Sequence, residues 1–211
     1  MSTLYNRFAG QSLERIAALS DGIFAVAMTL LVLDLRVPVS GVLHIHSELD
    51  LLKALGNLAP NLISYFMSFM TLGIFWVGQQ TQLNHFKSSD RNLAWLHLIF
   101  LLAVSLTPFS TSLLAAFITF RTALVIYWFN IFLLGAVLFV SWQYAKRAGL
   151  IKDDTNAEMR SAVERRIVIA QILYAVGALL CIFNTYLSIA VIILIQLNYA
   201  IAPRIRLLYR L

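Results

Sequence analysis

The sequence predicts an all-α integral membrane protein whose 211 residues form a single domain of six membrane-spanning helices. Composition is the first reason, because 60% of the residues are hydrophobic, 12% are charged and the mean hydropathy is +0.80. Soluble domains carry about 25% charged residues. The second reason is a series of apolar runs long enough to cross a bilayer, and the third is an uneven distribution of lysine and arginine.

Six apolar segments have the length of about 20 residues that a bilayer core requires. The expected spans are residues 14–35, 56–83, 92–117, 121–146, 164–184 and 186–203. The last two spans come from one almost unbroken apolar run, Ile167 to Ala202. We divide it because a single helix of that length would be about 54 Å long. A hydrocarbon core of about 30 Å cannot hold such a helix. The polar pair Asn184 and Thr185 is therefore the expected hairpin.

Basic residues predict the orientation of these spans. With a cytoplasmic amino terminus, thirteen lysines and arginines lie on the inner side and three, Arg36, Lys53 and Arg121, on the outer side. This bias follows the positive-inside rule and predicts a multi-pass protein with both termini in the cytoplasm. It also explains the net charge of +6, so the basic balance is no indication of nucleic-acid binding. The residues 37–55 form the expected outer loop.

The sequence favours neither an enzyme nor a fixed metal site. Its intramembrane polar residues form no plausible catalytic set, and the single Cys181 has no disulfide partner. His44 and His46 could hold a metal together with Glu48 or Asp50. Metal sites need three or four fixed ligands, so a solvated outer loop is the preferred interpretation. We expect no cofactor.

Asp21 is the one charged residue in the apolar run from Ile16 to Leu33. A carboxylate inside a membrane span is costly and is normally paired or functional. The first interpretation is a hydrogen-bonding anchor to neighbouring helices, and the second is a proton or ion ligand in a pathway. The candidate partners of the anchor are Trp76, Gln79, Gln80 and His97.

An apolar stripe lies on another face of the same helix. With about 100° per residue, Thr29, Leu30 and Leu33 fall within about 60° of Val26, whereas Ser20 and Asp21 lie about 120–140° away. By pattern alone, such a stripe is ordinary lipid-facing or packing surface.

Several motifs together resemble those of the transmembrane protein 175 family of potassium channels, in its prokaryotic branch. Arg15-x-x-x-Leu19-Ser20-Asp21 is similar to the family signature R-x-x-x-F-S-D, and Phe75-Trp76 to an F-W pair in the second helix. The run Phe100-Leu-Leu-Ala-Val-Ser-Leu-Thr-Pro-Phe-Ser-Thr111 is similar to L-x-x-x-S-x-x-P-F-x-T. Tyr127 and Trp142-x-Tyr144 also fit, so the resemblance covers residues 7–145.

The sequence departs from the family pattern at four positions. Leu19 replaces an aromatic residue, Gln79 and Gln80 replace a pair of histidines, and His97 replaces an asparagine. Glutamine donates and accepts hydrogen bonds but does not titrate, which leaves proton sensing by that pair in doubt.

The resemblance implies a potassium channel in the plasma membrane of a prokaryote, built as a homotetramer with the first helix of each subunit around the pore. Val26, Thr29 and Leu33 would then face the axis with Leu30 beside them. Val26 and Leu33 would form apolar constrictions, and the Thr29 hydroxyls would contact the permeating potassium ion. The residues implied to hold the first helix in place are Arg15, Ser20, Asp21, Trp76, Gln79 and His97.

Asp34, at the outer end of the first helix, could attract cations to the pore mouth, or it could simply pair with Arg36. Two other functions remain as alternatives. A secondary transporter or proton-coupled permease would need a midplane site and, usually, internal repeats, neither of which is seen. A non-conducting assembly protein would need a large inner domain or an amphipathic arm, and both are absent. The expected partners are further copies of the chain and membrane lipid, with no nucleic acid and no small-molecule substrate other than cations.

Overall fold

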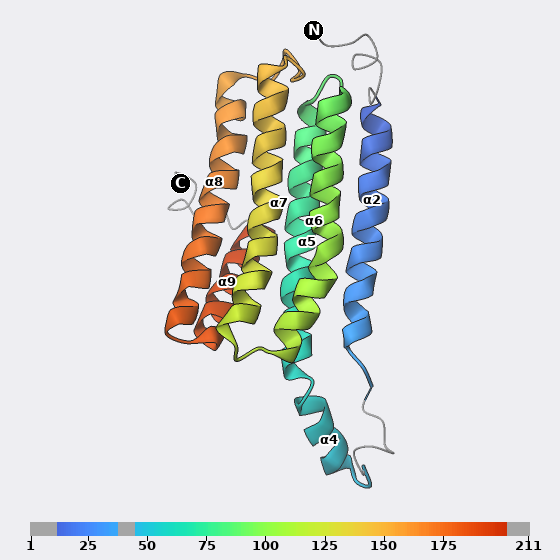
Figure 1. The fold of residues 1–211 in the computed structure, drawn as a ribbon, viewed down its shortest axis with the longest axis vertical. Helices are drawn as coiled ribbons and strands as arrows, with labels where there is room; N and C mark the ends of the chain where they lie inside the picture. Colours follow the sequence, from blue (N-terminus) through green and yellow to red (C-terminus); the bar gives the residue numbers. More distant parts are fainter. Residues whose placement is uncertain (1–11, 38–44, 202–211) are drawn as a thin grey trace.

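The computed structural model describes residues 12–37 and 45–201, and within these ranges the chain is helical (Figure 1). The elements are α2 (Leu13–Leu30), η1 (Leu31–Asp34), α4 (Glu48–Gly56), α5 (Ala59–His85), α6 (Arg91–Ala116), α7 (Arg121–Arg147), α8 (Ala157–Leu179), η2 (Leu180–Ile182) and α9 (Thr185–Ile201). Five helical segments are long and apolar enough to cross a membrane: Leu13–Asp34, Ala59–His85, Arg91–Ala116, Arg121–Arg147 and Ala157–Ile182. The apolar α9 is shorter, with 17 residues in the described part of the chain.

Polar caps fix where the helices begin. Ser12 Oγ accepts a hydrogen bond from the Arg15 amide at 3.3 Å, and Asp90 Oδ1 accepts one from the Leu93 amide at 2.8 Å. Asn156 Oδ1 does the same for the Met159 amide at 2.7 Å. Each cap satisfies a donor that lacks a partner inside its helix. At the other end of α7, Gly149 adopts a positive φ of 68°, a conformation that glycine reaches at little cost.

The predicted hairpin between the last two helices is confirmed. The 3₁₀ turn η2 ends at Ile182, and α9 begins at Thr185. Asn184 Oδ1 accepts hydrogen bonds from the amides of Tyr186 at 2.8 Å and Leu187 at 3.4 Å, which starts the new helix. The helix α8 begins at Ala157, seven residues before the expected start of the fifth span, because Asn156 caps it in the linker.

Two other span ends show local detail that apolar length alone does not predict. The expected second span began at residue 56, but a break at Asn57 and Leu58 separates the short α4 from α5, which carries Pro60 in its first turn. The expected first span was one α-helix, but its last turn is the 3₁₀ segment η1. There the Leu35 amide donates to the Val32 carbonyl at 3.0 Å, a tighter turn that is common where a helix stops.

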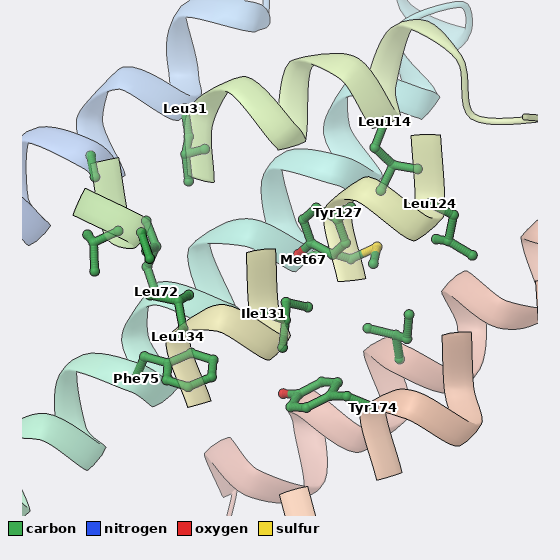
Figure 2. Packing of buried hydrophobic residues seen from close by; sticks show 14 of the residues in the cluster. Leu31, Met67, Leu72, Phe75, Leu114, Leu124, Tyr127, Ile131, Leu134 and Tyr174 are labelled. Carbon is green, nitrogen blue, oxygen red and sulfur yellow. The ribbon is translucent and has the colours of Figure 1, made fainter. Parts of the chain in front are cut away.

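The core lies among α5, α6 and α7, with α2 packed on one side and α8 and α9 on the other (Figures 1 and 2). Met67 and Leu72 of α5 are fully buried against Leu114, Tyr127 and Leu134 of the neighbouring helices. On this scaffold α2 is a peripheral helix, attached to the bundle through α5 and α6.

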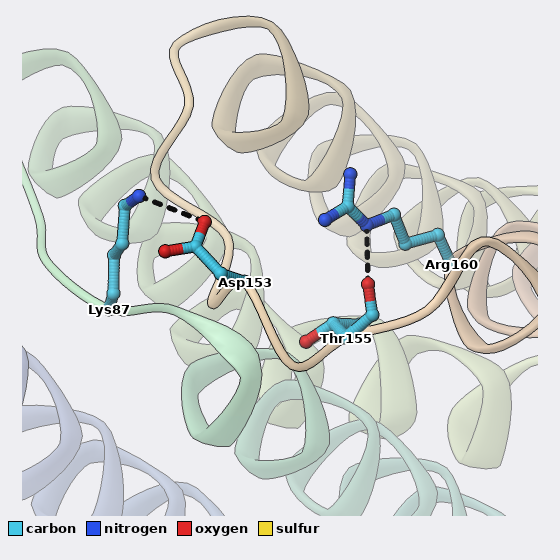
Figure 3. Close-up of polar contacts among 4 residues, drawn as sticks. All are labelled: Lys87, Asp153, Thr155 and Arg160. Carbon is cyan, nitrogen blue, oxygen red and sulfur yellow. Dashed lines mark hydrogen bonds and ion pairs between the residues drawn. The ribbon is translucent and has the colours of Figure 1, made fainter.

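The loops after α5 and α7 meet at one end of the bundle, the end at which α2 begins (Figure 1). An isolated β-bridge pairs Phe86 with Ile151, and the Lys87 amide donates to the Leu150 carbonyl at 2.9 Å. Figure 3 shows Lys87 Nζ 3.4 Å from Asp153 Oδ1 and Arg160 Nε donating to the Thr155 carbonyl at 2.9 Å. Backbone pairing therefore fixes the two loops to each other.

Candidate functional site

The helix α2 has one face against the bundle and one face without a protein neighbour among the described residues. Its buried side comprises Ser20, Phe24 and Ala27, followed by Leu31 in η1. The stripe singled out from the sequence lies on the other side, with exposed fractions of 58% for Val26, 44% for Leu30 and 65% for Leu33, and Thr29 is exposed as well. In the single chain, the four expected pore-lining residues thus share one accessible surface.

The hydroxyl of Thr29 is hydrogen-bonded to its own helix. Its Oγ1 lies 3.0 Å from the Ala25 carbonyl oxygen and 2.9 Å from that of Val26. Because the hydroxyl proton is held by these acceptors, the oxygen presents its lone pairs to the accessible side. Such an oxygen is suited to contact a cation.

Asp21 is tied to α5 by two side chains one turn apart. Its Oδ1 accepts hydrogen bonds from Trp76 Nε1 at 2.7 Å and from Gln80 Nε2 at 2.9 Å. Hydrogen bonds to a carboxylate are shorter and stronger than neutral ones. They attach the start of α2 to the second span and offset part of the cost of a carboxylate in an apolar segment.

Ser20 lies beside this anchor and forms a second, fully buried link. Its Oγ donates to the Ile16 carbonyl at 2.8 Å and accepts a hydrogen bond from Gln79 Nε2 at 2.9 Å. The same Gln79 nitrogen lies 3.2 Å from His97 Nδ1 of α6. Ser20, Gln79 and His97 thus join three helices, and the structure divides the expected partners of Asp21 between two adjacent clusters.

The two remaining site candidates, Arg15 and Asp34, lie at the ends of the first helix. Arg15 is exposed, and the hydrogen bonds described for it involve its backbone rather than its guanidinium group. Asp34 is half-buried: Ser112 of α6 donates to its carboxylate, and Asn61 Nδ2 of α5 donates to its carbonyl at 3.3 Å. The carboxylate therefore ties the carboxyl-terminal end of the first span to α6.

A shallow apolar groove of about 580 Å³ runs between α2 and α6. Val26 and Leu30 line it from one side, and Leu98, Leu102 and Ser105 line it from the other. The stripe on α2 therefore continues onto a second apolar surface on α6.

A polar network that was not predicted from the sequence lies in the centre of the bundle. Tyr127 OH of α7 lies 3.3 Å from Ser68 Oγ and 3.1 Å from Thr71 Oγ1 of α5. Thr111 Oγ1 of α6 donates to Ser68 at 2.6 Å, and Gln196 Nε2 of α9 donates to Thr71 at 2.7 Å. Gln196, the one glutamine in the most apolar helix, was the signal that could have revealed it.

No metal centre is formed by the described residues, since no three His, Cys, Asp or Glu side chains lie together there. His44, one of the alternative metal ligands, lies outside the described residues. Asp50, another, caps α4 with Ser47, whose Oγ donates to Asp50 Oδ2 at 2.7 Å.

Comparison with known proteins connects this geometry to one family. Residues 15–108, which include both anchoring clusters and the α2 stripe, match the model of the family described as endosomal/lysosomal potassium channel TMEM175. A protein named potassium channel from Streptomyces collinus is 28% identical over 88% of this chain and 90% of its own length. One with the same description from Chamaesiphon minutus is also 28% identical, over 89% of this chain and 93% of its own.

More distant relatives and a solved structure agree with these matches. An animal protein named endosomal/lysosomal proton channel TMEM175, from Bos taurus, is 31% identical over 50% of this chain but only 23% of its own length. The crystal structure of a lysosomal potassium-selective channel TMEM175 homolog from Chamaesiphon minutus superposes with a TM-score of 0.79 at 25% identity, covering 91% of this chain and 98% of that one. The signature residues, the bacterial relatives matched over most of their length and the shared fold all make this chain similar to TMEM175 channels.

Proposed function

We propose that this chain is the subunit of a potassium-conducting channel, in which four copies surround a pore lined by α2. Potassium ions cross passively, and no cofactor takes part. The observation that carries the proposal is the position of α2, a membrane-length helix anchored by polar bonds on one face while Val26, Thr29 and Leu33 stay accessible on the other.

The anchoring bonds explain why this face is available to line a pore. Asp21 and Ser20 are held by Trp76, Gln80 and Gln79 of α5, so the rotation of α2 about its own axis is fixed. A helix held in this way always turns the stripe of Val26, Thr29 and Leu33 away from α5. Closed rotational symmetry then brings identical stripes from several subunits around one axis.

The stripe has the chemistry that a simple cation pore needs. Rings of Val26 and Leu33 side chains would narrow the path and exclude water when it is closed, because hydrophobic constrictions gate by dewetting. A ring of Thr29 hydroxyls would offer oxygen lone pairs to a partly dehydrated potassium ion between them. Asp34 at the end of the same helix would add negative potential to one mouth of the pore.

The proposed subunit has six spans, with α9 as the sixth, since the 17 described residues of this apolar helix reach the lower limit for crossing a bilayer. The described lysines and arginines support cytoplasmic termini and a plasma-membrane location. Those that begin α6, end α7 and lie in the linker and first turns of α8 are at the end where α2 starts, while the basic residues after η1, in α4 and at the start of α7 are at the other end (Figure 1).

The first experiment records single channels from purified protein in planar bilayers and compares Val26→Ala with the wild type. Removing two methyl groups from each subunit widens the constriction, so we expect a higher conductance or a leak in the closed state. Val176→Ala is the matched control, because Val176 lies on α8 with a similar exposed fraction of 53%. Unchanged currents in Val26→Ala would count against the pore assignment.

Thr29→Ala tests selectivity. We expect the reversal potential between potassium and sodium solutions to move toward zero, since the variant removes the hydroxyl ring. Thr81→Ala is the control: its hydroxyl is also exposed and hydrogen-bonded to its own helix, donating to the Val77 carbonyl at 2.8 Å, but it lies on α5. The same recordings under a proton gradient report whether protons also pass, and flux that saturates and depends on a second ion would favour a transporter instead.

A further inference from the structure

A second groove, with a volume of about 810 Å³, lies between α6 and α7 and is lined by a different set of α6 residues from the groove beside α2. Its lining changes character along its length. Polar and basic residues come from the first turn of α6 and the last turns of α7, and apolar residues follow one to two turns deeper. The complete lining is Arg91, Asn92, Trp95, Leu96, Ile99, Phe139, Val140, Gln143, Tyr144 and Arg147.

We propose that this groove binds an anionic phospholipid, with the phosphate between Arg91 and Arg147 and an acyl chain lying along the apolar part. This site is separate from the proposed pore and does not depend on it. Charge complementarity carries the assignment, because two guanidinium groups from different helices line the same end of one groove. Guanidinium groups recognise phosphate through paired hydrogen bonds and remain charged at every physiological pH.

The direction of α6 adds to the positive potential at that end. Arg91 is the first residue of α6, and a helix amino terminus carries a partial positive charge. The nearby carboxylate of Asp90 is engaged within the protein: it accepts hydrogen bonds from the Leu93 amide at 2.8 Å and from Tyr144 OH at 2.5 Å. Asn92 Nδ2 also bonds to the Tyr144 hydroxyl, at 3.1 Å, which fixes the polar wall of the groove.

The apolar part of the groove is suited to a lipid chain rather than to water. Trp95 has an exposed fraction of 56% one turn from Arg91, a position typical of tryptophan at a membrane interface. Ile99 and Val140 continue the surface and are 45% and 49% exposed. Ile99 lies about 12 Å along α6 from Arg91, so the groove extends from headgroup depth into the hydrocarbon region. Basic pockets between membrane helices are known to bind anionic headgroups.

Native mass spectrometry of the purified protein with added phosphatidylglycerol, phosphatidylcholine or inorganic phosphate tests this proposal. We expect the wild type to retain phosphatidylglycerol in preference to phosphatidylcholine, and Arg91→Gln/Arg147→Gln to bind phosphatidylglycerol roughly tenfold more weakly. The matched control is Lys152→Gln/Arg165→Gln, which removes two exposed positive charges at the same end of the bundle but outside the groove. The control should bind like the wild type.

Three outcomes would overturn the site. Equal weakening in both double variants would mean diffuse attraction to basic charge. Equal retention of the two lipids by the wild type would mean ordinary annular lipid. Displacement of the lipid by inorganic phosphate would mean an anion site without an acyl-chain contact.

Fluorescence quenching gives an independent measurement that does not rely on extraction from the membrane. Phosphatidylglycerol brominated in its acyl chain should quench the protein more than brominated phosphatidylcholine does, and Trp95→Phe should abolish that difference. A difference that persists in Trp95→Phe would place the bound chain elsewhere and contradict the proposal.

Discussion

The helices α2 and α6 are almost equally apolar, yet the protein uses them differently. Both spans are long and apolar enough to cross a membrane, but 22% of the most apolar part of Leu13–Asp34 is buried inside the chain, against 50% of the most apolar part of α6. Hydropathy measures the tendency to leave water and does not distinguish a protein interior from lipid or from a closed pore. The position of polar side chains makes the distinction here.

The polar residues of α6 face several neighbours, whereas those that anchor α2 face one side. In α6, His97, Thr107 and Thr111 are all buried and bond to α5 or α7. In α2, Ser20 and Asp21 both bond to α5 near one end, and beyond Arg15 in the first turn the polar residue of the exposed stripe is Thr29. A helix attached in this way is stable against the bundle while one of its faces stays available to other subunits.

The largest expected effect separates the two faces of α2. Phe24 is 2% exposed and packs 5.9 Å from the ring of Phe100, so Phe24→Ala leaves a cavity and should cost about 3–5 kcal/mol of unfolding free energy. Leu33→Ala on the exposed face should change it by less than about 0.5 kcal/mol in a dispersed subunit. Thermal unfolding in detergent measures both.

The same pair also tests assembly. If Leu33 faces a pore or a neighbouring subunit, Leu33→Ala should alter current or oligomer stability while leaving subunit unfolding unchanged. A loss of subunit stability as large as that of Phe24→Ala would show that the two faces of α2 do not differ in the way described.

The anchor at Asp21 should have an intermediate effect. Asp21→Ala removes the acceptor for both Trp76 and Gln80, and we expect a loss of about 1–2 kcal/mol, at the lower end for charged hydrogen bonds because Asp21 is exposed. Asp21→Asn keeps an acceptor oxygen and should lose less. Chemical unfolding in detergent ranks the three proteins, and equal losses in Asn and Ala variants would mean that the charge, not the hydrogen-bond geometry, holds the helix.

Much of the fold follows from local pattern in the sequence. Apolar length placed the spans, and the length limit of a bilayer placed the hairpin at Asn184, where the structure also breaks. The structure brings Trp76 and Gln80 to Asp21, two of the four partner residues considered, because a carboxylate in an apolar segment needs donors from an adjacent helix.

Features that depend on distant pairing could not be read in this way. The bridge between Phe86 and Ile151 needs two loops from separate hairpins to meet, and no local motif encodes that. Hydroxyls such as Ser68 and Thr111 can bond either to their own helix or across to another, so the sequence alone does not choose between these partners. The same limit applies to the assembly around α2. The sequence of one chain predicts which face of α2 is exposed, but it does not say what covers that face.

Among the substitutions at buried or anchoring residues, Tyr127→Phe should give the smallest effect, and it tests the contrast between the two helices from the side of α6. The variant removes one hydroxyl from a network in which Ser68 keeps Thr111 as a partner and Thr71 keeps Gln196. Because no buried group is left without a partner, we expect a loss of about 0.6 kcal/mol, the average for a hydrogen bond between membrane helices. A double-mutant cycle with Ser68→Ala in detergent measures the coupling. A loss above that of Asp21→Ala would mean that the central network is cooperative, and that the bundle around α6 depends on polar bonds as strongly as α2 does.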